Sequence, residues 1–323
     1  MPLRTKIAFA VAIVVLAAAI VVPIAVDDPY IQRVMAIAAL ESLLAVSLNL
    51  VLGYGGLISL AQVAFYGVGA YTAALLALRL HLPFLLNLPA SIVLCGAVAW
   101  MFARPLLRLR GHYFAIATFV FALLAQAIEN NWESVTRGTN GLPGIPTPSL
   151  VVWTAETNLD DYFLALGLLV ACLLVVARVV HSPFGRSLAA VRDDDRAAAS
   201  VGIEVGRVRT IAFVLAAAIA GAGGALYAQY TTFVSAQPFG TDHMITILAA
   251  AAIGGLGTLA GPVAGATLLT MLPEVLRGIS NWRMVVFGAL VIVVVLVRPD
   301  GLAGLARAAW AAVVRTRRSG LDR

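Results

Sequence analysis

Long apolar runs follow one another along the chain, separated by short polar or glycine-rich segments. Runs of about 17–25 apolar residues are long enough to cross a hydrocarbon core of roughly 30 Å as α-helices. Backbone amides in lipid must be satisfied within the segment, so repeated runs of this length indicate an all-α polytopic membrane protein. The pattern predicts about ten transmembrane helices, at residues 7–26, 31–52, 63–80, 86–103, 112–129, 162–180, 210–229, 243–257, 263–278 and 284–298.

The first apolar run, residues 7–26, follows Arg4 and Lys6, as the hydrophobic part of a secretory signal peptide would. Its length of 20 residues exceeds the about 7–15 residues that such a segment has. No small-x-small cleavage motif precedes Asp27. We therefore expect this run to be a retained first span.

The composition excludes several classes of protein. Hydrophobic residues make up 61% of the 323 residues and charged residues only 12%, which excludes an ordinary water-soluble globule. The formal net charge is +6, but lysine and arginine stand at predicted helix ends, where they orient a membrane protein rather than bind nucleic acid. Cys95 and Cys172 lie inside apolar runs without metal-ligand spacing, so we expect them to pack between helices.

Basic residues are distributed unequally between the two predicted sides of the membrane. With a cytoplasmic N-terminus, the inside segments carry 17 of the 22 lysines and arginines, as the positive-inside rule requires. Both termini are then cytoplasmic, and most acidic side chains, Glu129 among them, lie outside. Residues 130–161 form an extracytoplasmic loop, whereas residues 181–209 and a basic tail at 299–323 face the cytoplasm.

The sequence lacks the common signatures of catalysis. Lys6 is the one lysine, so the chain has no P-loop lysine with which to bind ATP. The four histidines are scattered without ligand spacing, and neither Gly-x-Ser-x-Gly nor His-Glu-x-x-His occurs. We therefore expect a non-catalytic chain without a metal or cofactor of its own.

Glu41 is the one ionisable residue that the pattern places near the middle of a span. A charge at that depth costs about 2.5–3.5 kcal/mol or more, so such a residue is a candidate functional site. Ser42, Ser47 and Asn49 give the same helix an unusually polar face. The alternative is structural, namely a protonated Glu41 that hydrogen-bonds to a neighbouring helix.

Two uncharged, glycine-rich breaks interrupt the apolar pattern, at residues 53–62 and 254–262. Within them, residues 55–61 (GGLISLA) and 254–260 (GGLGTLA) share five identities and one Ser/Thr exchange. Since each break follows a span that runs inward, the match predicts a parallel internal repeat. Such breaks are tolerated where they are buried in protein or line a cavity, so tight packing and a substrate pathway both remain open.

Two of the predicted loops have a composition that suggests contact with other proteins. Residues 181–209 are densely charged and lie between two long apolar runs, which suggests that a soluble partner binds them. Residues 136–146 are rich in turn-forming residues, and their stiffening by proline and glycine is consistent with a docking surface on the outside.

Four ordered motifs resemble those of branched-chain amino acid ABC-transporter permeases of the LivM type. They are residues 48–62 with 65–71 (LNLVLGYGGLISLAQ and FYGVGAY), 139–142 (TNGL), 182–186 (SPFGR) and 254–262 (GGLGTLAGP). The resemblance covers residues 30–302 and implies one permease domain, residues 1–323, with a fold similar to type II importers. It also implies a bacterial inner-membrane complex with a sister permease, an extracytoplasmic binding protein and two cytoplasmic ATPases that bind ATP and Mg²⁺.

The resemblance and the polar residues together suggest three groups of functional residues. The substrate pathway is expected to include Glu41, Asn49, Gly55, Gly56, Ser59, Gln62, Tyr66, Gly254, Gly255 and Thr258. The contact with the ATPases is expected to include Arg192, Asp193, Asp194, Asp195, Arg196, Ala197, Ala198 and Gly202, projecting from one short helix. Docking of the binding protein is expected to involve Arg137, Thr139 and Asn140. Arg196 departs from the family pattern, which often has an acidic residue at this position. The polar group of the ATPase that this position would contact therefore stays open.

Two alternative functions remain at the level of the sequence. Urea and short-chain amide permeases share almost all of these motifs, so the cargo could differ. A stand-alone secondary carrier, with Glu41 as its coupling carboxylate, would belong to another class. The charged, alanine-rich segment 181–209 argues against that carrier, because only a chain that binds an ATPase needs such a segment.

Overall fold

The computed structural model of the protein describes residues 17–26, 28–109, 111–150, 153–154, 157–275, 288, 301–302 and 304. In chain order the elements are the helix Ala17–Val26, α2 (Pro29–Asn49), the π-helical turn η1 (Leu50–Tyr54), α3 (Gln62–Leu80), α4 (Phe84–Leu106), α5 (His112–Asn131), α6 (Glu133–Thr136), the 3₁₀ turn η2 (Gly138–Asn140), β1 (Leu142–Pro143), β2 (Ser149–Leu150), β3 (Trp153–Thr154), α7 (Asn158–Val180), α8 (Pro183–Asp193), α9 (Asp195–Ser200), α10 (Val205–Thr231), β4 (Phe233–Val234), the 3₁₀ turn η3 (Gln237–Phe239), α11 (Thr241–Gly254) and α12 (Gly261–Val275).

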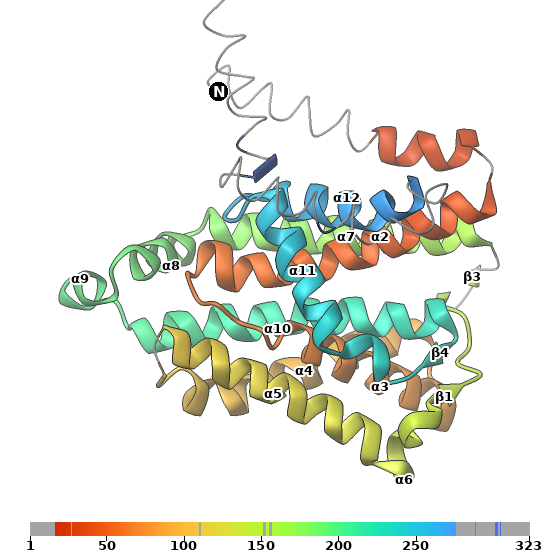
Figure 1. Ribbon diagram of the computed structural model, residues 1–323, viewed down its shortest axis with the longest axis horizontal. Coiled ribbons are helices and arrows are strands. Elements are labelled where there is room, and N and C mark those ends of the chain that lie inside the picture. Colours follow the sequence, from red (N-terminus) through yellow and green to blue (C-terminus); the bar gives the residue numbers. More distant parts are fainter. Residues whose placement is uncertain are drawn as a thin grey trace, which may run out of the picture.

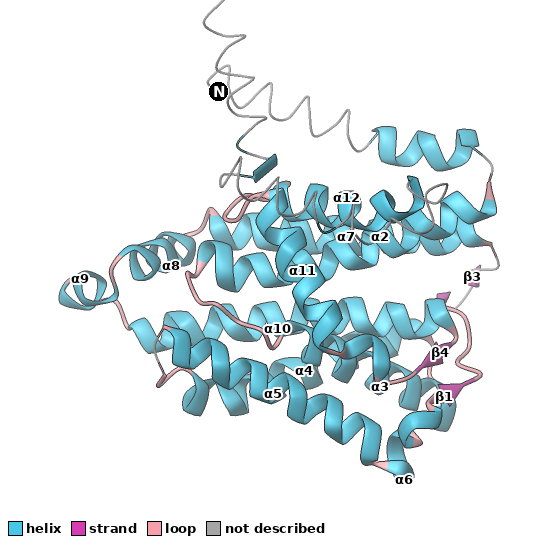
Figure 2. Ribbon diagram, in the orientation of Figure 1, coloured by secondary structure: helices cyan, strands magenta, loops and turns pink. Residues whose placement is uncertain are grey.

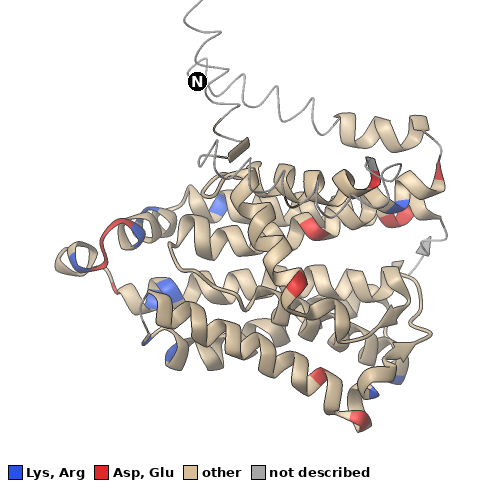
Figure 3. Ribbon diagram, viewed as in Figure 1, with Lys and Arg blue, Asp and Glu red and all other residues tan. Residues whose placement is uncertain are grey.

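The long helices lie side by side as a bundle, and strands contribute only short pairs (Figures 1 and 2). α8 and α9 project from one end of the bundle, the α8 end, whereas β1, β4 and α6 lie at the opposite end, the β1 end (Figure 1). Charged residues gather mainly toward these two ends, and the middle of the bundle holds few of them (Figure 3). This distribution is that of a protein whose central zone lies in lipid.

Six helices of the described chain are long and apolar enough to cross a bilayer. They are Pro29–Tyr54, Gln62–Leu80, Phe84–Leu106, His112–Asn131, Asn158–Val180 and Val205–Thr231. Each corresponds to one of the predicted spans, with ends displaced by at most five residues. The prediction of a polytopic helical membrane protein is therefore confirmed, whereas the number of ten spans and the internal repeat stay predictions.

The remaining predicted spans are only partly described. The helix Ala17–Val26, α11 and α12 occupy the places of three of them. α11 has 14 residues, so it is about 21 Å long and crosses only part of a core of roughly 30 Å. The span predicted at 284–298 and the tail at 299–323 lie outside the described residues, except for 288, 301, 302 and 304.

Local sequence signals fix where two of the long helices begin. The carboxylate of Asp28 accepts a hydrogen bond from the N–H of Tyr30 at 2.9 Å, and Pro29 occupies the first turn, where a missing N–H is tolerated. α7 begins with a capping box, in which the side chains of Thr157 and Asp160 each accept from the other's backbone N–H. Both helices start at the β1 end. They begin at Pro29 and Asn158, before the predicted starts at residues 31 and 162, so the connections that precede them are shorter than predicted.

Small residues allow α3, α4 and α10 to pack with their backbones in contact. A Cβ atom added to Gly69 of α3 would overlap the backbone of Gly221 of α10, and one added to Gly224 would overlap the carbonyl oxygen of Tyr66. A Cβ on Gly221 would also lie 2.5 Å from Sγ of Cys95 in α4. Close packing of this kind replaces the hydrophobic effect as the force that holds helices together in lipid.

We expect Gly224→Ala to destabilise the protein even though alanine is the better helix former. The added methyl group has no room against Tyr66, and overpacking costs about 1–3 kcal/mol. Gly167→Ala in α7 is the matched control, because nothing lies within 4 Å of its added Cβ and helix propensity improves by up to about 1 kcal/mol. Thermal unfolding of the purified variants measures both changes. A Gly224→Ala variant as stable as the wild type would contradict this packing.

α2 lies among α7, α10, α11 and α12. Ala45 of α2 packs against Ala250 and Ile253 of α11, which in turn contact Ala266 and Leu269 of α12. The hydroxyl of Ser42 donates a hydrogen bond to the carbonyl oxygen of Ala38 at 2.6 Å, so this buried hydroxyl is satisfied within its own helix. α2 is thus largely buried from Ala36 to Asn49, which places the polar residues of this part of the helix inside the protein.

The loop after α5 is tied to the connection between α10 and α11. β1 pairs antiparallel with β4, with Leu142 opposite Val234 and Pro143 opposite Phe233. A Cβ on Gly141 would lie 2.5 Å from the carbonyl oxygen of Val234, and its φ of +67° favours glycine. The outer loop predicted at 130–161 therefore begins later, after Asn131, and is partly ordered by a partner that lies about 90 residues away in sequence.

Candidate functional site

Asn49 joins the two glycine-rich breaks at the α8 end of the bundle. Its Nδ2 donates to the carbonyl oxygen of Thr258 at 2.8 Å, and its Oδ1 accepts from the N–H of Gly257 at 2.8 Å. Asn49 is 1% exposed, so these bonds are shielded from water and each is more costly to lose than on a surface. The two breaks thus form one structure, although about 200 residues separate them in the chain.

Gly53 lies at the point where the breaks touch. A Cβ on this residue would overlap both the amide nitrogen of Gly257 and the side chain of Asn49. Any residue larger than glycine would therefore separate the two backbones. We call Asn49, Gly53, Arg192, Gly257 and Thr258 the junction.

Arg192 enters the junction from α8. Its Nη1 donates to the carbonyl oxygen of Gly53 at 2.6 Å and would lie 3.3 Å from a Cβ on Gly257. Its Cγ would lie 2.8 Å from a Cβ on Gly56. Carbonyl groups at the end of a helix lack an internal partner and attract cations, so a guanidinium suits the end of η1. Arg192 is also an exposed residue, so its predicted contact with an ATPase stays a prediction beside this bond to Gly53.

The apolar face of α8 docks on the same region. Leu188 and Val191, each 1% exposed, pack with Ala198 and Val208, and Tyr54 of η1 packs against this cluster. α8 is therefore fixed to the first break both by apolar contact and by the bond from Arg192 to Gly53. A displacement of α8 would act directly on the first break, and on the second break through Asn49.

The remaining pathway candidates of the first break are buried inside the bundle. Ser59 and Gln62 are 0% and 2% exposed. Gln62 accepts from the hydroxyl of Ser47 at 3.0 Å, and that hydroxyl also lies 2.8 Å from the carbonyl oxygen of Ala216. The segment after Tyr54 thus returns to the depth of Ser47 before α3 begins. In this conformation Ser59 and Gln62 are satisfied by protein groups.

The second break is a compact turn. The hydroxyl of Thr258 donates to the carbonyl oxygen of Gly255 at 2.8 Å and accepts from the N–H of Gly261 at 3.1 Å. Gly255 has a φ of +110°, and a Cβ on Gly254 would overlap the carbonyl oxygen of Gly261. These glycines therefore have a packing role, whatever else they do.

The predicted coupling segment consists of two short helices rather than one. α8 ends at Asp193, and Asp194 caps α9 by accepting from the N–H groups of Arg196 at 2.8 Å and Ala197 at 3.1 Å. The bonds from Ala197 and Arg196 hold the pKa of the Asp194 carboxyl below its usual range, so it is ionised at neutral pH. The prediction of a single helix was wrong because an aspartate favours a cap over a helix interior.

The outer surface of this two-helix arm is open. Asp193, Arg196 and Ala197 are exposed, whereas Ala198 is buried against α8. Asp195 forms an ion pair with Arg209 of α10 at 3.5 Å. Gly202 has a φ of +86°, and nothing lies within 4 Å of a Cβ added to it.

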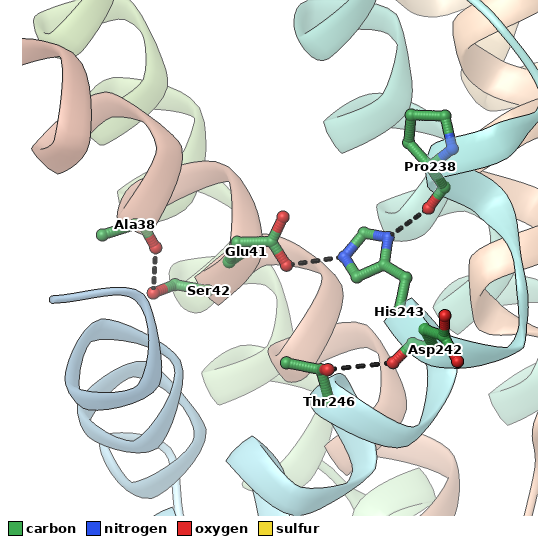
Figure 4. Close-up of polar contacts among 7 residues, drawn as sticks. All are labelled: Ala38, Glu41, Ser42, Pro238, Asp242, His243 and Thr246. Atoms are coloured by element: carbon green, nitrogen blue, oxygen red, sulfur yellow. Dashed lines mark hydrogen bonds and ion pairs between the residues drawn. The ribbon is translucent and has the colours of Figure 1, made fainter. Parts of the chain in front are cut away.

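Glu41 forms an ion pair with His243 in the middle of the bundle. Oε2 of Glu41 lies 2.7 Å from Nε2 of His243, and Nδ1 of His243 lies 2.8 Å from the carbonyl oxygen of Pro238 (Figure 4). The imidazole ring lies between these two oxygens, and the side chain of Asp242 points away from Glu41 (Figure 4). Glu41 stands about 18 Å along α2 from its start, near the middle of the helix Pro29–Tyr54. Its depth in the membrane stays a prediction.

The geometry restricts the protonation of this pair. A carbonyl oxygen can only accept, so Nδ1 of His243 carries a hydrogen. The short contact at Nε2 then requires one shared proton, which either His243 donates to a carboxylate or Glu41 donates to a neutral ring. Both forms have no net charge, which reduces the cost of placing the pair at this depth.

Aromatic rings surround the pair. The ring of Tyr66 is perpendicular to that of His243 at 6.1 Å and lies 5.5 Å from Tyr227 and 6.0 Å from Phe239. Tyr66 is 1% exposed, whereas the side chains of Glu41 and His243 are 18% and 19% exposed. The pair is therefore the more accessible part of a largely buried cluster.

Glu129 is a second carboxyl group inside the bundle. It lies in the last turn of α5 and is 5% exposed, and its place on the outer side of the membrane stays a prediction. Neither carboxylate oxygen has a hydrogen-bond partner among the described residues. Its Oε1 would lie 2.5 Å from a Cβ on Gly67 of α3, so glycine makes the space for it.

The docking candidates lie on the surface at the β1 end. Arg137, Thr139 and Asn140 are exposed, and they stand in and beside η2. Arg137 has a φ of +59° and connects α6 to η2. These residues lie at the end of the bundle opposite the α8 end (Figure 1).

His243 is the functional candidate that reasoning from sequence missed. It was taken as a scattered residue at the edge of a span. The motif Pro238-Phe239-Gly240 before a short apolar run was the available signal, because a break of this kind starts a helix inside the membrane.

Comparison with known proteins gives matches over most of the chain. Residues 30–295 match the family model described as branched-chain amino acid transport system / permease component. The chain is 32% identical over 288 residues to the high-affinity branched-chain amino acid transport system permease protein LivM of Escherichia coli (strain K12), which covers 82% of this chain and 68% of the relative. It is 25% identical over 280 residues to the permease protein LivH of the same organism, which covers 81% of this chain and 91% of the relative. No solved structure matches the chain significantly.

Proposed function

The chain belongs to the family of branched-chain amino acid transport permease components, and from this we propose that it is the transmembrane permease subunit of an ATP-driven, binding-protein-dependent importer of branched-chain amino acids. Urea and short-chain amides are less favoured as cargo, because the relatives that match most of the chain are branched-chain amino acid permeases. The subunit is non-catalytic, and ATP and Mg²⁺ are bound by partner ATPases. The protein lies in the bacterial inner membrane with its termini and the α8 end in the cytoplasm.

The junction is the observation that carries this proposal. It connects a charged, exposed arm to two breaks in membrane helices through Arg192 and Asn49. A permease that an external ATPase drives requires such a mechanical link between its cytoplasmic surface and its pathway. We therefore assign α8 and α9 as the coupling segment, with Asp193, Arg196, Ala197 and Gly202 toward the ATPase.

The pathway is assigned to the region between the junction and the pair Glu41–His243. Glu41 and Asn49 are eight residues apart on α2, about 12 Å along the helix. Thr258 of the junction, and Ser59 and Gln62 beside it, would reach the cargo only when the two breaks separate. We assign Arg137, Thr139 and Asn140 to the docking of the binding protein at the outer surface.

A sister permease completes the proposed complex. LivM and LivH of one organism carry the name of the same transport system, and both match most of this chain. Two permease chains of common descent fit a heterodimer, which would bind one ATPase at each coupling segment.

We expect the purified chain to hydrolyse no ATP by itself. Reconstituted with its sister permease, ATPases and binding protein, it should import radiolabelled leucine only when ATP and the binding protein are both present. Vesicles that contain the chain alone, with an imposed proton or sodium gradient, provide the control. Accumulation driven by that gradient and lost in Glu41→Gln would establish a secondary carrier instead. Uptake of urea or acetamide in preference to leucine would change the cargo but not the class.

A further inference from the structure

The ends of α4 and α10 enclose a pocket of about 680 Å³ at the α8 end of the bundle. Its rim carries Arg104 from the last turn of α4, Arg108 from the turn that follows α4, and Arg207 from the first turn of α10. Glu204 is the acidic residue of the lining. Three arginines against one glutamate make the rim cationic.

The rim arginines are available to an external anion. All three side chains belong to exposed residues, and the ion pairs of the described chain are Arg209–Asp195 and His243–Glu41. The guanidinium of Arg104 lies 5.8 Å from the centre of the Trp100 ring, which holds it on the pocket side of α4.

The pocket changes from polar to apolar toward the middle of the bundle. On α4, Trp100 lies one turn deeper than Arg104 and is 61% exposed. On α10, Ile211 and Val214 follow the rim residue Arg207 at increasing depth. Tryptophan is enriched at the boundary between headgroups and acyl chains. The order of charged rim, tryptophan and aliphatic floor is the order of phosphate, glycerol and acyl chain in a phospholipid.

We propose that this pocket binds an anionic phospholipid of the cytoplasmic leaflet, with its phosphate between Arg104, Arg108 and Arg207 and one acyl chain along Ile211 and Val214. Basic pockets between membrane helices on the cytoplasmic side bind anionic headgroups by the same charge complementarity. α10 begins directly after the arm formed by α8 and α9, so a bound lipid joins α4 to the base of that arm. The inference rests on the proposed cytoplasmic orientation of the α8 end and on a bilayer around the bundle, and not on the identity of the cargo.

Native mass spectrometry of the purified full-length chain tests the proposal. The protein is released from nanodiscs that contain equal amounts of phosphatidylglycerol and phosphatidylcholine, and the retained lipids are counted. We expect the wild type to retain phosphatidylglycerol in preference. Each arginine near a membrane surface contributes about fivefold in affinity, so the double variant Arg104→Gln/Arg207→Gln should lose roughly twentyfold or more.

Three controls keep the result decisive. Arg178 is an exposed arginine in the last turn of α7, at the α8 end of the bundle but outside the pocket. The variant Arg178→Gln should therefore retain lipid as the wild type does. Arg104→Lys keeps the charge and should retain most binding, and thermal unfolding shows whether each variant is folded. Equal loss in Arg178→Gln, equal retention of phosphatidylcholine, or full displacement by millimolar inorganic phosphate would overturn the proposal.

Discussion

Replacing Arg192 with glutamine is expected to reduce ATP-driven uptake at least tenfold while the complex still assembles. The guanidinium donates a charge-assisted hydrogen bond to the carbonyl oxygen of Gly53, and bonds of this kind contribute about 1.5–3 kcal/mol. A free-energy difference of this size changes an equilibrium constant by about ten- to a hundredfold. The equilibrium in question is between the state in which α8 is joined to Gly53 and the state in which this bond is broken. The apolar docking of Leu188 and Val191 remains, so α8 keeps its place against the bundle.

Three measurements on the reconstituted complex test this expectation. They are leucine uptake, ATP hydrolysis stimulated by the binding protein, and co-purification of the ATPases. Arg186→Gln is the control, since Arg186 is an exposed arginine of the same helix for which no contact with the breaks is found among the described residues. We expect Arg192→Gln to hydrolyse ATP without matching uptake and Arg186→Gln to transport normally. Normal, fully coupled uptake in Arg192→Gln would show that the junction does not transmit the motion.

The second large effect is expected at the pair Glu41–His243. His243→Ala leaves a carboxyl group that is 18% exposed without its partner, and removing one partner of a buried pair costs about 3–5 kcal/mol. Partial exposure reduces this figure, so we expect a loss of about 2–4 kcal/mol in the free energy of unfolding. Glu41→Gln should cost less, because its amide can still donate to Nε2 of His243.

A double-mutant cycle separates the pair from other effects of these substitutions. The variant Glu41→Gln/His243→Ala should be more stable than His243→Ala, because it no longer contains an unpaired carboxyl group. Thermal unfolding gives the coupling energy, and uptake by the folded double variant gives the role of the pair. Strictly additive changes would contradict the ion pair. Normal uptake by the double variant would assign the pair to structure rather than to the pathway.

The sequence by itself determined the architecture at the level of segments. Runs of apolar residues predicted six spans that the structure contains, because the thickness of the bilayer fixes the length of an apolar helix. Glycine and proline marked the two breaks, because turns depend on neighbouring residues alone. The place of Glu41 near the middle of its helix followed from the same apolar pattern.

Only the tertiary structure decided which residues meet. Asn49 forms hydrogen bonds with Gly257 and Thr258, which lie about 200 residues away in the chain. Arg192 forms a hydrogen bond with Gly53, and Glu41 forms one with His243. The polar and apolar residues of α2 are not separated onto opposite faces, so its sequence does not show which face meets which neighbour. In lipid the faces of such helices are chosen by close packing at small residues, and that choice depends on the partner helices rather than on the segment itself.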